Sequence, residues 1–110
     1  MGFGKRAYVH NRRRFPREEV MLAGSALSVT RSRSVVIADL SAGGARLGGR
    51  DLPAPGDDML MVVGSQDRIA TVKWRSGDKC GVSVDEPLDA RDIARMKQEA
   101  AWETVTGWAR

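Results

Sequence analysis

The sequence is poor in residues that hold metals, form disulfides or span membranes. Its 110 residues include one cysteine, Cys80, and one histidine, His10. A single cysteine excludes an intrachain disulfide and suits a reducing cytoplasm. With so few soft ligands, no set of side chains suits a structural zinc or iron site. No apolar run is as long as a membrane span, and residues 1–7 lack the hydrophobic stretch of a signal peptide. We therefore expect a cytoplasmic protein without metal, cofactor or membrane contact.

The sequence also lacks the side-chain patterns that catalysis requires. It contains no glycine-rich loop that opens a helix, and no nucleophile stands in a recognisable pattern with a base. Asp57 and Asp58 follow Pro55 and Gly56, which are typical of turns, so we interpret the two carboxylates as solvent-facing. We therefore predict a binding protein and not an enzyme.

Negative charge is absent from the beginning of the chain. Residues 1–17 contain six lysines or arginines and no acidic residue, whereas the remainder carries 12 basic and 14 acidic residues. The net charge of +4 therefore comes from this leader. A basic segment attached to a nearly neutral domain predicts a localised anionic partner. We expect residues 1–18 to be a flexible leader, because they lack apolar periodicity and their like charges repel one another.

Short β-branched or alternating segments make up most of the remaining chain. Turn residues, mainly glycine, proline, serine and aspartate, separate these segments. Short strands at this spacing predict an antiparallel barrel or sandwich over residues 19–88, with a tight hairpin at Gly77-Asp78. The predicted strands are Val20–Val29, Ser34–Asp39, Ala45–Leu47, Met59–Val63, Arg68–Arg75 and Gly81–Val84.

The pattern then changes from strand to helix. Asp89 is the predicted N-cap, and Asp92 lies in the first turn, where the helix dipole favours an acidic residue. Apolar residues recur at helical spacing, namely Ile93, Met96 and Ala100. We predict one amphipathic helix from about Ala90 to Glu103, within a C-terminal segment of residues 89–110 that covers an open end or face of the barrel.

Two short motifs carry the candidate binding chemistry. The first is the run Asn11–Arg17, which holds four arginines in seven residues. The second lies at a predicted strand end, where Asp39 and Ser41 project to the same side and Gly43 and Gly44 follow. Such glycines permit backbone angles that a side chain opposes, and they let a ligand come close. Taken separately, the first motif is typical of a solvated leader and the second of an ordinary turn.

Together the two motifs resemble the two-part signature of the PilZ domain family. Its first part is a pair of arginines separated by three residues, and its second part has the pattern D-x-S-x-x-G. The matching residues here are Arg13, Arg17, Asp39, Ser41 and Gly44. Further similarity lies in the segments Val36–Ser41, Val72–Arg75 and Gly81–Val84. The resemblance implies a six-stranded antiparallel β-barrel, followed here by the predicted helix, that binds the bacterial second messenger cyclic di-GMP.

The resemblance also implies which residues bind the ligand. Arg13 and Arg17 are the implied principal clamps, because a guanidinium binds phosphate bidentately and also matches the O6 and N7 edge of guanine. Arg12 and Arg14 flank them, and Arg12 is the favoured auxiliary. Asp39 is implied to accept hydrogen bonds from the N1–H and N2–H₂ edge of guanine.

The remaining candidates have weaker assignments. Ser41 is implied to add a further hydrogen bond, and Gly44 to keep the turn open. Trp74 shares a predicted strand face with apolar residues, so we expect it in the core, with stacking on guanine as the alternative. Cys80 is expected to be an inert strand cysteine, and His10 has no assigned role.

The sequence therefore predicts a sensor that binds cyclic di-GMP and signals to a separate, unidentified protein partner. One alternative is a single-stranded nucleic-acid-binding β-barrel, although six aromatic residues offer few stacking platforms. Another is a PilZ-like interaction module that has lost its ligand, against which the presence of all five motif residues argues.

Overall fold

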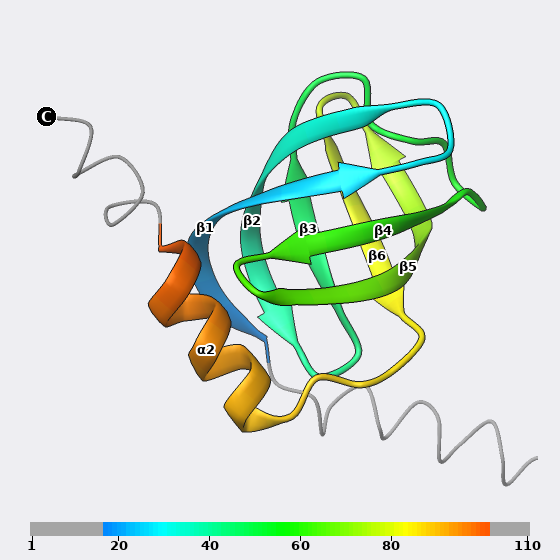
Figure 1. The fold of residues 1–110 in the computed structure, drawn as a ribbon. Helices are drawn as coiled ribbons and strands as arrows, with labels where there is room; N and C mark the ends of the chain where they lie inside the picture. Colours follow the sequence, from blue (N-terminus) through cyan, green and yellow to red (C-terminus); the bar gives the residue numbers. More distant parts are fainter. Residues whose placement is uncertain (1–16, 102–110) are drawn as a thin grey trace, which may run out of the picture.

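Six antiparallel strands pair around a closed barrel in the order β1-β2-β3-β6-β5-β4, and one helix packs beside them (Figure 1). The computed structural model describes residues 17–101. The strands are β1 (Glu18–Leu27), β2 (Ser32–Ser41), β3 (Gly44–Gly48), β4 (Asp58–Val63), β5 (Gln66–Ser76) and β6 (Lys79–Val84), and the helix is α2 (Ala90–Ala100). The predicted fold class, a six-stranded antiparallel barrel followed by a helix, is confirmed.

Alternation of side chains along the strands builds the core. Inward-facing residues of every strand are buried in one cluster, and its largest fully buried members include Ile37, Leu47, Met61 and Val72. Cys80 is also fully buried, as expected, and burial raises the pKa of its thiol, so the side chain remains protonated at neutral pH.

The turns follow the glycines of the sequence. The predicted hairpin at Gly77-Asp78 is present, because Ser76 pairs with Lys79 across it and Gly77 has a φ of 62°. A positive φ at the first turn position is the geometry of a type II′ hairpin, which glycine adopts without strain. Asp57 and its neighbour are solvent-exposed, as predicted from the turn pattern.

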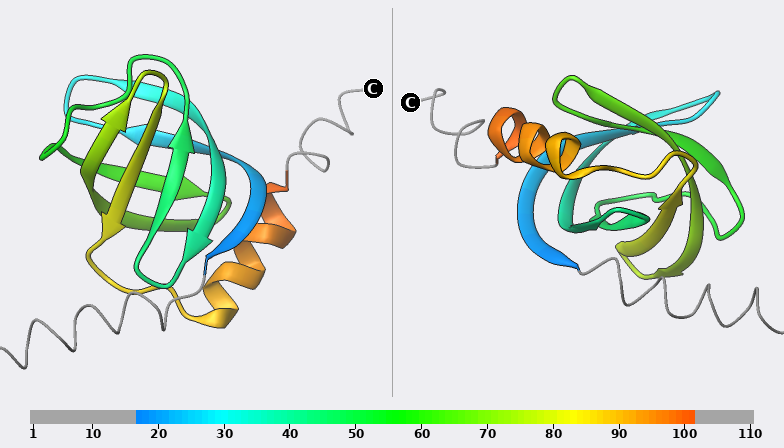
Figure 2. Two further views of the ribbon diagram at one scale, coloured as in Figure 1. Left: turned by 180° about the vertical axis from the view of Figure 1, so that it is seen from behind. Right: turned by 90° about the horizontal axis from the view of Figure 1, so that it is seen from below.

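Helix α2 fills the gap that opens where β1 leaves β4. The two strands pair only over Ser25–Leu27, and beyond this point α2 contacts β1, β4 and β5. Met96 and Ala100 point into the same core as the strands. The other views show α2 against the outside of β1, reached by a linker that crosses one end of the barrel (Figure 2). Helix α2 therefore covers the barrel, as expected, and does so beside β1.

The ends of α2 agree only in part with the prediction. Asp89 is the N-cap, and its carboxylate accepts a hydrogen bond from the Asp92 backbone while the Asp92 side chain bonds back to the Asp89 backbone. The expected continuation to Glu103 is wrong, because the helix ends at Ala100. Ala101 is extended, with φ −53° and ψ 132°, and forms a β-bridge with Leu22.

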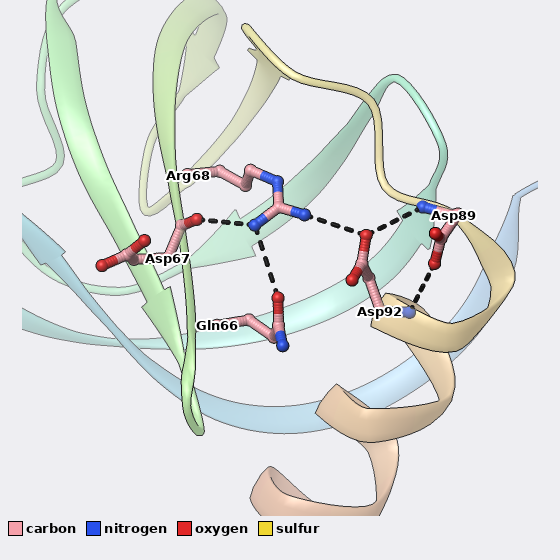
Figure 3. Close-up of polar contacts among 5 residues, drawn as sticks. All are labelled: Gln66, Asp67, Arg68, Asp89 and Asp92. Carbon is pink, nitrogen blue, oxygen red and sulfur yellow. Dashed lines mark hydrogen bonds and ion pairs between the residues drawn. The ribbon is translucent and has the colours of Figure 1, made fainter.

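Polar contacts attach α2 to the β4–β5 hairpin. The Arg68 guanidinium donates to Asp92 at 2.8 Å, so the capping carboxylate also forms an ion pair with β5 (Figure 3). At the other end of the helix, Glu99 accepts hydrogen bonds from the backbone and hydroxyl of Ser65, which lower the pKa of the Glu99 carboxyl.

Within residues 17–101, no helix is long and apolar enough to cross a membrane.

Candidate binding site

The β2–β3 hairpin carries the second predicted motif. Ser41 pairs with Gly44 around a two-residue turn, and two residues further from the turn Asp39 pairs with Arg46. Because side chains alternate along a strand, Asp39 and Ser41 lie on the same face, which is the outer face of the barrel, while Leu40 between them is buried in the core. The predicted common orientation of the motif side chains follows from this register.

Asp39 is a buried carboxylate between two guanidinium groups. Its side chain is only 7% exposed, and its Oδ2 lies 3.9 Å from Arg17 Nη1 and 3.5 Å from Arg46 Nε. Arg17 precedes β1 directly and its own side chain is 66% exposed. Two positive charges at this distance offset the free-energy penalty of burying the carboxylate.

The two ion pairs leave the acceptor capacity of Asp39 unused. Both separations exceed the 2.7–3.2 Å of a typical hydrogen bond. Among residues 17–101, no group donates a hydrogen bond to the Asp39 side chain, although a carboxylate offers about four acceptor positions. The carboxylate is therefore neutralised electrostatically and remains able to accept N–H donors from a ligand.

The motif glycine has a structural role that differs from the expected one. Neither Gly43 nor Gly44 has a positive φ, so the expectation of unusual backbone angles is wrong. A Cβ at Gly44 would instead lie 2.1 Å from the backbone oxygen of Val82 on β6. Ser41 Oγ reaches the Gly44 carbonyl at 3.4 Å, a long hydrogen bond that leaves the hydroxyl available to a ligand.

The register across the sheet extends the outer face beyond the hairpin. Arg46 pairs with Gly81 on β6, and Gly81 pairs with Trp74 on β5. Asp39, Arg46, Gly81 and Trp74 therefore form one row across β2, β3, β6 and β5, which we call the outer row. At about 4.8 Å per strand, the row spans roughly 14 Å.

Trp74 belongs to this outer row and not to the core. The core prediction is wrong, because the side chain is 41% exposed while Ala70 and Val72 are buried. A β-bulge between Val72 and Trp74 adds one residue to β5 and reverses the face of Trp74. The indole lies directly over Gly81, where a Cβ would be 2.2 Å from Nε1. The absence of a side chain at Gly81 makes room for the ring.

Arg46 is the residue of the site that the sequence analysis missed. Its guanidinium lies beside Asp39 and is partly exposed. The signal was present in the sequence, since a two-residue turn at Ala42-Gly43 would by itself place Asp39 opposite Arg46. Of the predicted basic residues, the structure brings Arg17 to Asp39, whereas Arg12, Arg13 and Arg14 lie outside the described residues, as does His10.

The hairpin turn is also attached to the linker that leads to α2. Val84 N donates to the Gly43 carbonyl at 3.0 Å, and Leu88 N donates to the Ala42 carbonyl at 2.8 Å. Lys97 of α2 forms an ion pair with Glu18, the residue after Arg17. The hairpin turn and the residue next to Arg17 are therefore both in contact with the C-terminal part of the described chain.

The structure thus combines a small closed barrel with an arginine-flanked carboxylate on its outer face. Among the described residues, no group of three or more His, Cys, Asp or Glu side chains is placed to hold a metal ion. A family model described as the PilZ domain matches residues 11–101, nearly the whole chain, and the chain therefore belongs to the PilZ domain family. PilZ domains are generally non-catalytic binding modules, and the family typically binds cyclic di-GMP. A search of curated proteins found no match.

Proposed function

We propose that this PilZ domain binds cyclic di-GMP on its outer row. The observation that carries the proposal is the buried Asp39 carboxylate, which has two guanidinium neighbours and no hydrogen-bond donor among the described residues. Guanine supplies N1–H and N2–H₂ donors on one edge, and these suit a carboxylate that has free acceptor positions. Ser41, two residues along the same face, is placed to add a hydroxyl contact.

The charges of the site suit the two phosphates of the ligand. Arg17 is mostly exposed and only loosely paired, so it is free to turn from Asp39 to a phosphate when guanine takes over the carboxylate. Arginine binds phosphate through two parallel hydrogen bonds and keeps its charge at any physiological pH. We propose Arg13 as the second clamp on the motif match, with Arg12 and Arg14 as auxiliaries.

Trp74 is proposed to stack on one guanine. Its indole is packed over Gly81 and remains 41% exposed, so part of the ring surface is open to a base. Stacking of a base on an aromatic side chain contributes about 1–3 kcal/mol. This contribution is smaller than that of two arginine–phosphate contacts, and we therefore assign Trp74 a supporting role.

Base identity gives the first test of the proposal. Calorimetric titration with cyclic di-GMP is expected to show saturable binding, and cyclic di-AMP is expected to bind at least tenfold more weakly. Adenine lacks the N1–H and N2–H₂ donors, and a buried acceptor left unpaired costs about 1–3 kcal/mol, or more when charged. Asp39→Ala should reduce this preference. Equal affinity of the unaltered protein for the two dinucleotides would remove Asp39 from base recognition.

Salt dependence separates this ligand from a nucleic acid. The affinity for a dinucleotide with two phosphates should fall only weakly as salt rises, whereas a protein that neutralises many phosphates of a polymer loses affinity steeply. A steep decrease for single-stranded oligonucleotides, together with no heat from cyclic di-GMP, would favour the nucleic-acid-binding alternative.

We further propose that ligand binding orders the segment Arg12–Arg17 over the outer row and so creates a surface for a separate protein partner. The phosphates supply the negative charge that this arginine-rich segment lacks, and fixing each residue costs about 1–2 kcal/mol, which limits the ordered stretch to a few residues. Backbone ¹⁵N relaxation with and without cyclic di-GMP should show that the amplitude of picosecond–nanosecond motion in Arg12–Arg17 decreases after binding. Equal rigidity of this segment and the strands before ligand is added would contradict the switch.

A further inference from the structure

A second basic site lies along the parts of β2 and β3 that are farthest from the Ser41–Gly44 turn. A hollow of about 580 Å³ is lined by the beginning of β2 and the end of β3, together with the segments beside them. Arg31, Arg33 and Arg50 line it, with Ser32, Ser34 and Asp51. Arg33 and Asp39 are six residues apart on β2, or roughly 20 Å along the strand, and none of the outer-row residues lines the hollow, although Gly48 of its lining is two residues from Arg46 on β3.

Arg33 is the unusual residue of this hollow. It pairs with the buried Ala26 of β1 and, like Val35 two residues later, faces the interior side of the strand. Its Nε and Nη1 atoms are buried and make no hydrogen bond with any described residue. Arg33 as a whole is half-buried, but these two guanidinium nitrogens have lost water without gaining a hydrogen bond, which is unfavourable for the fold. Such a group in a native structure requires an explanation, and binding of a ligand is one.

The remaining charges of the hollow do not compensate Arg33. Asp51 is the one acidic side chain that lines it, and its Oδ2 lies 3.9 Å from Arg31. Asp51 also has a positive φ of 54°, which the loop maintains although the residue is not glycine. Arg33 and Arg50 therefore leave an excess of two positive charges around a concave surface, where field lines concentrate.

We propose that this hollow binds a phosphomonoester or diphosphate group of a small ligand. A multiply charged phosphate matches the excess of two positive charges, whereas one carboxylate would leave a guanidinium unpaired. The site is independent of the proposed function, because none of the outer-row residues lines it.

Titration of the whole chain with pyrophosphate, at constant ionic strength, tests the proposal. Amide NMR shifts should saturate and should concentrate in residues 31–36 and 48–51. Arg33→Gln and Arg50→Gln are each expected to weaken binding at least tenfold, since each removes a charge-assisted pair. Arg95→Gln, an exposed arginine of α2 that does not line the hollow, is the matched control and should bind as the unaltered protein does.

A second measurement concerns the cost of Arg33 itself. Without ligand, Arg33→Gln should fold with a melting temperature equal to or above that of the unaltered protein, because the two buried guanidinium nitrogens that lack hydrogen bonds are gone. Pyrophosphate should raise the melting temperature of the unaltered protein more than that of the variant. Citrate serves as the carboxylate probe and should bind more weakly.

Four results would overturn the proposal. The first is the absence of saturable binding, and the second is a set of shifts centred on residues 39–46. The third is pyrophosphate affinity that is the same in both hollow variants as in the control. Citrate binding equal to or tighter than pyrophosphate binding would show that phosphate is the wrong ligand class.

Discussion

Arg17→Ala is expected to weaken cyclic di-GMP binding at least tenfold, and to leave the fold intact. A charge-assisted hydrogen bond contributes about 1.5–3 kcal/mol, and Arg17 is proposed to make such bonds to a phosphate. Its side chain is 66% exposed and precedes the first strand, so its removal takes little from the core. Calorimetry with purified protein measures the loss directly. Arg13→Ala is expected to have an effect of the same size, on the strength of the motif match.

The control for these variants is Arg91→Ala. Arg91 is an exposed arginine of α2. Its substitution removes the same charge from a part of the surface that takes no part in the proposed site. A nonspecific basic attraction would weaken in all three variants, whereas a clamp at Arg17 would leave the Arg91 variant unchanged. Affinity equal to that of the unaltered protein in both the Arg13 and Arg17 variants would show that the site is wrongly assigned.

Gly44→Ala is expected to destabilise the protein by about 3 kcal/mol, at the upper end of the range for overpacked sites. The new Cβ would lie 2.1 Å from the Val82 backbone oxygen, and a paired strand cannot move aside as a flexible side chain can. Gly48→Ala is the matched control on the same strand. There the nearest atom is the Asp78 backbone oxygen, at 3.8 Å, and neither glycine has a positive φ.

Urea unfolding of the two variants makes this comparison. Gly48→Ala should keep the free energy of unfolding within about 1 kcal/mol of the unaltered value, or raise it slightly through loss of unfolded-state freedom. If the Gly44 variant were as stable as the Gly48 variant, the glycine of the motif would be needed for the ligand alone. If the Gly44 variant is destabilised as expected, a loss of ligand binding in that variant is explained by disturbed barrel packing before any direct contact between Gly44 and the ligand.

The strands were predictable from the sequence because alternation and turn residues agree along most of the chain. Prediction failed at Trp74, where a single extra residue in β5 reverses the face of the side chain. Alternation assumes an uninterrupted register, and a bulge is set by the partner strand, which one-dimensional periodicity does not contain. The predicted C-terminal end of α2 was wrong for a related reason, because the pairing of Ala101 with Leu22 is a long-range contact.

The candidate site was predictable where it depends on local motifs. Asp39 and Ser41 lie on the same face as expected, because they are two positions apart on one strand. Arg46 was missed because it acquires its place by pairing across the hairpin and not by its own neighbours in sequence. Gly44 was predicted as part of the motif, but the reason why glycine is needed there was not predicted. The Val82 oxygen that excludes a side chain lies almost forty residues further along the chain.

The closed strand order restricts how a protein partner can recognise this domain. Many partners bind by adding a strand to an open sheet edge, where unpaired backbone N–H and C=O groups are available. Here β1 pairs with β4 over Ser25–Leu27 and closes the ring, and the rest of β1 on that side is contacted by α2 and by the bridge between Leu22 and Ala101, so the described residues leave only a short strand edge open. We therefore expect recognition of the barrel to depend on side chains and on a bound ligand more than on strand addition. Specificity for a partner would then change with the chemistry of one face while the backbone of the barrel stays as it is.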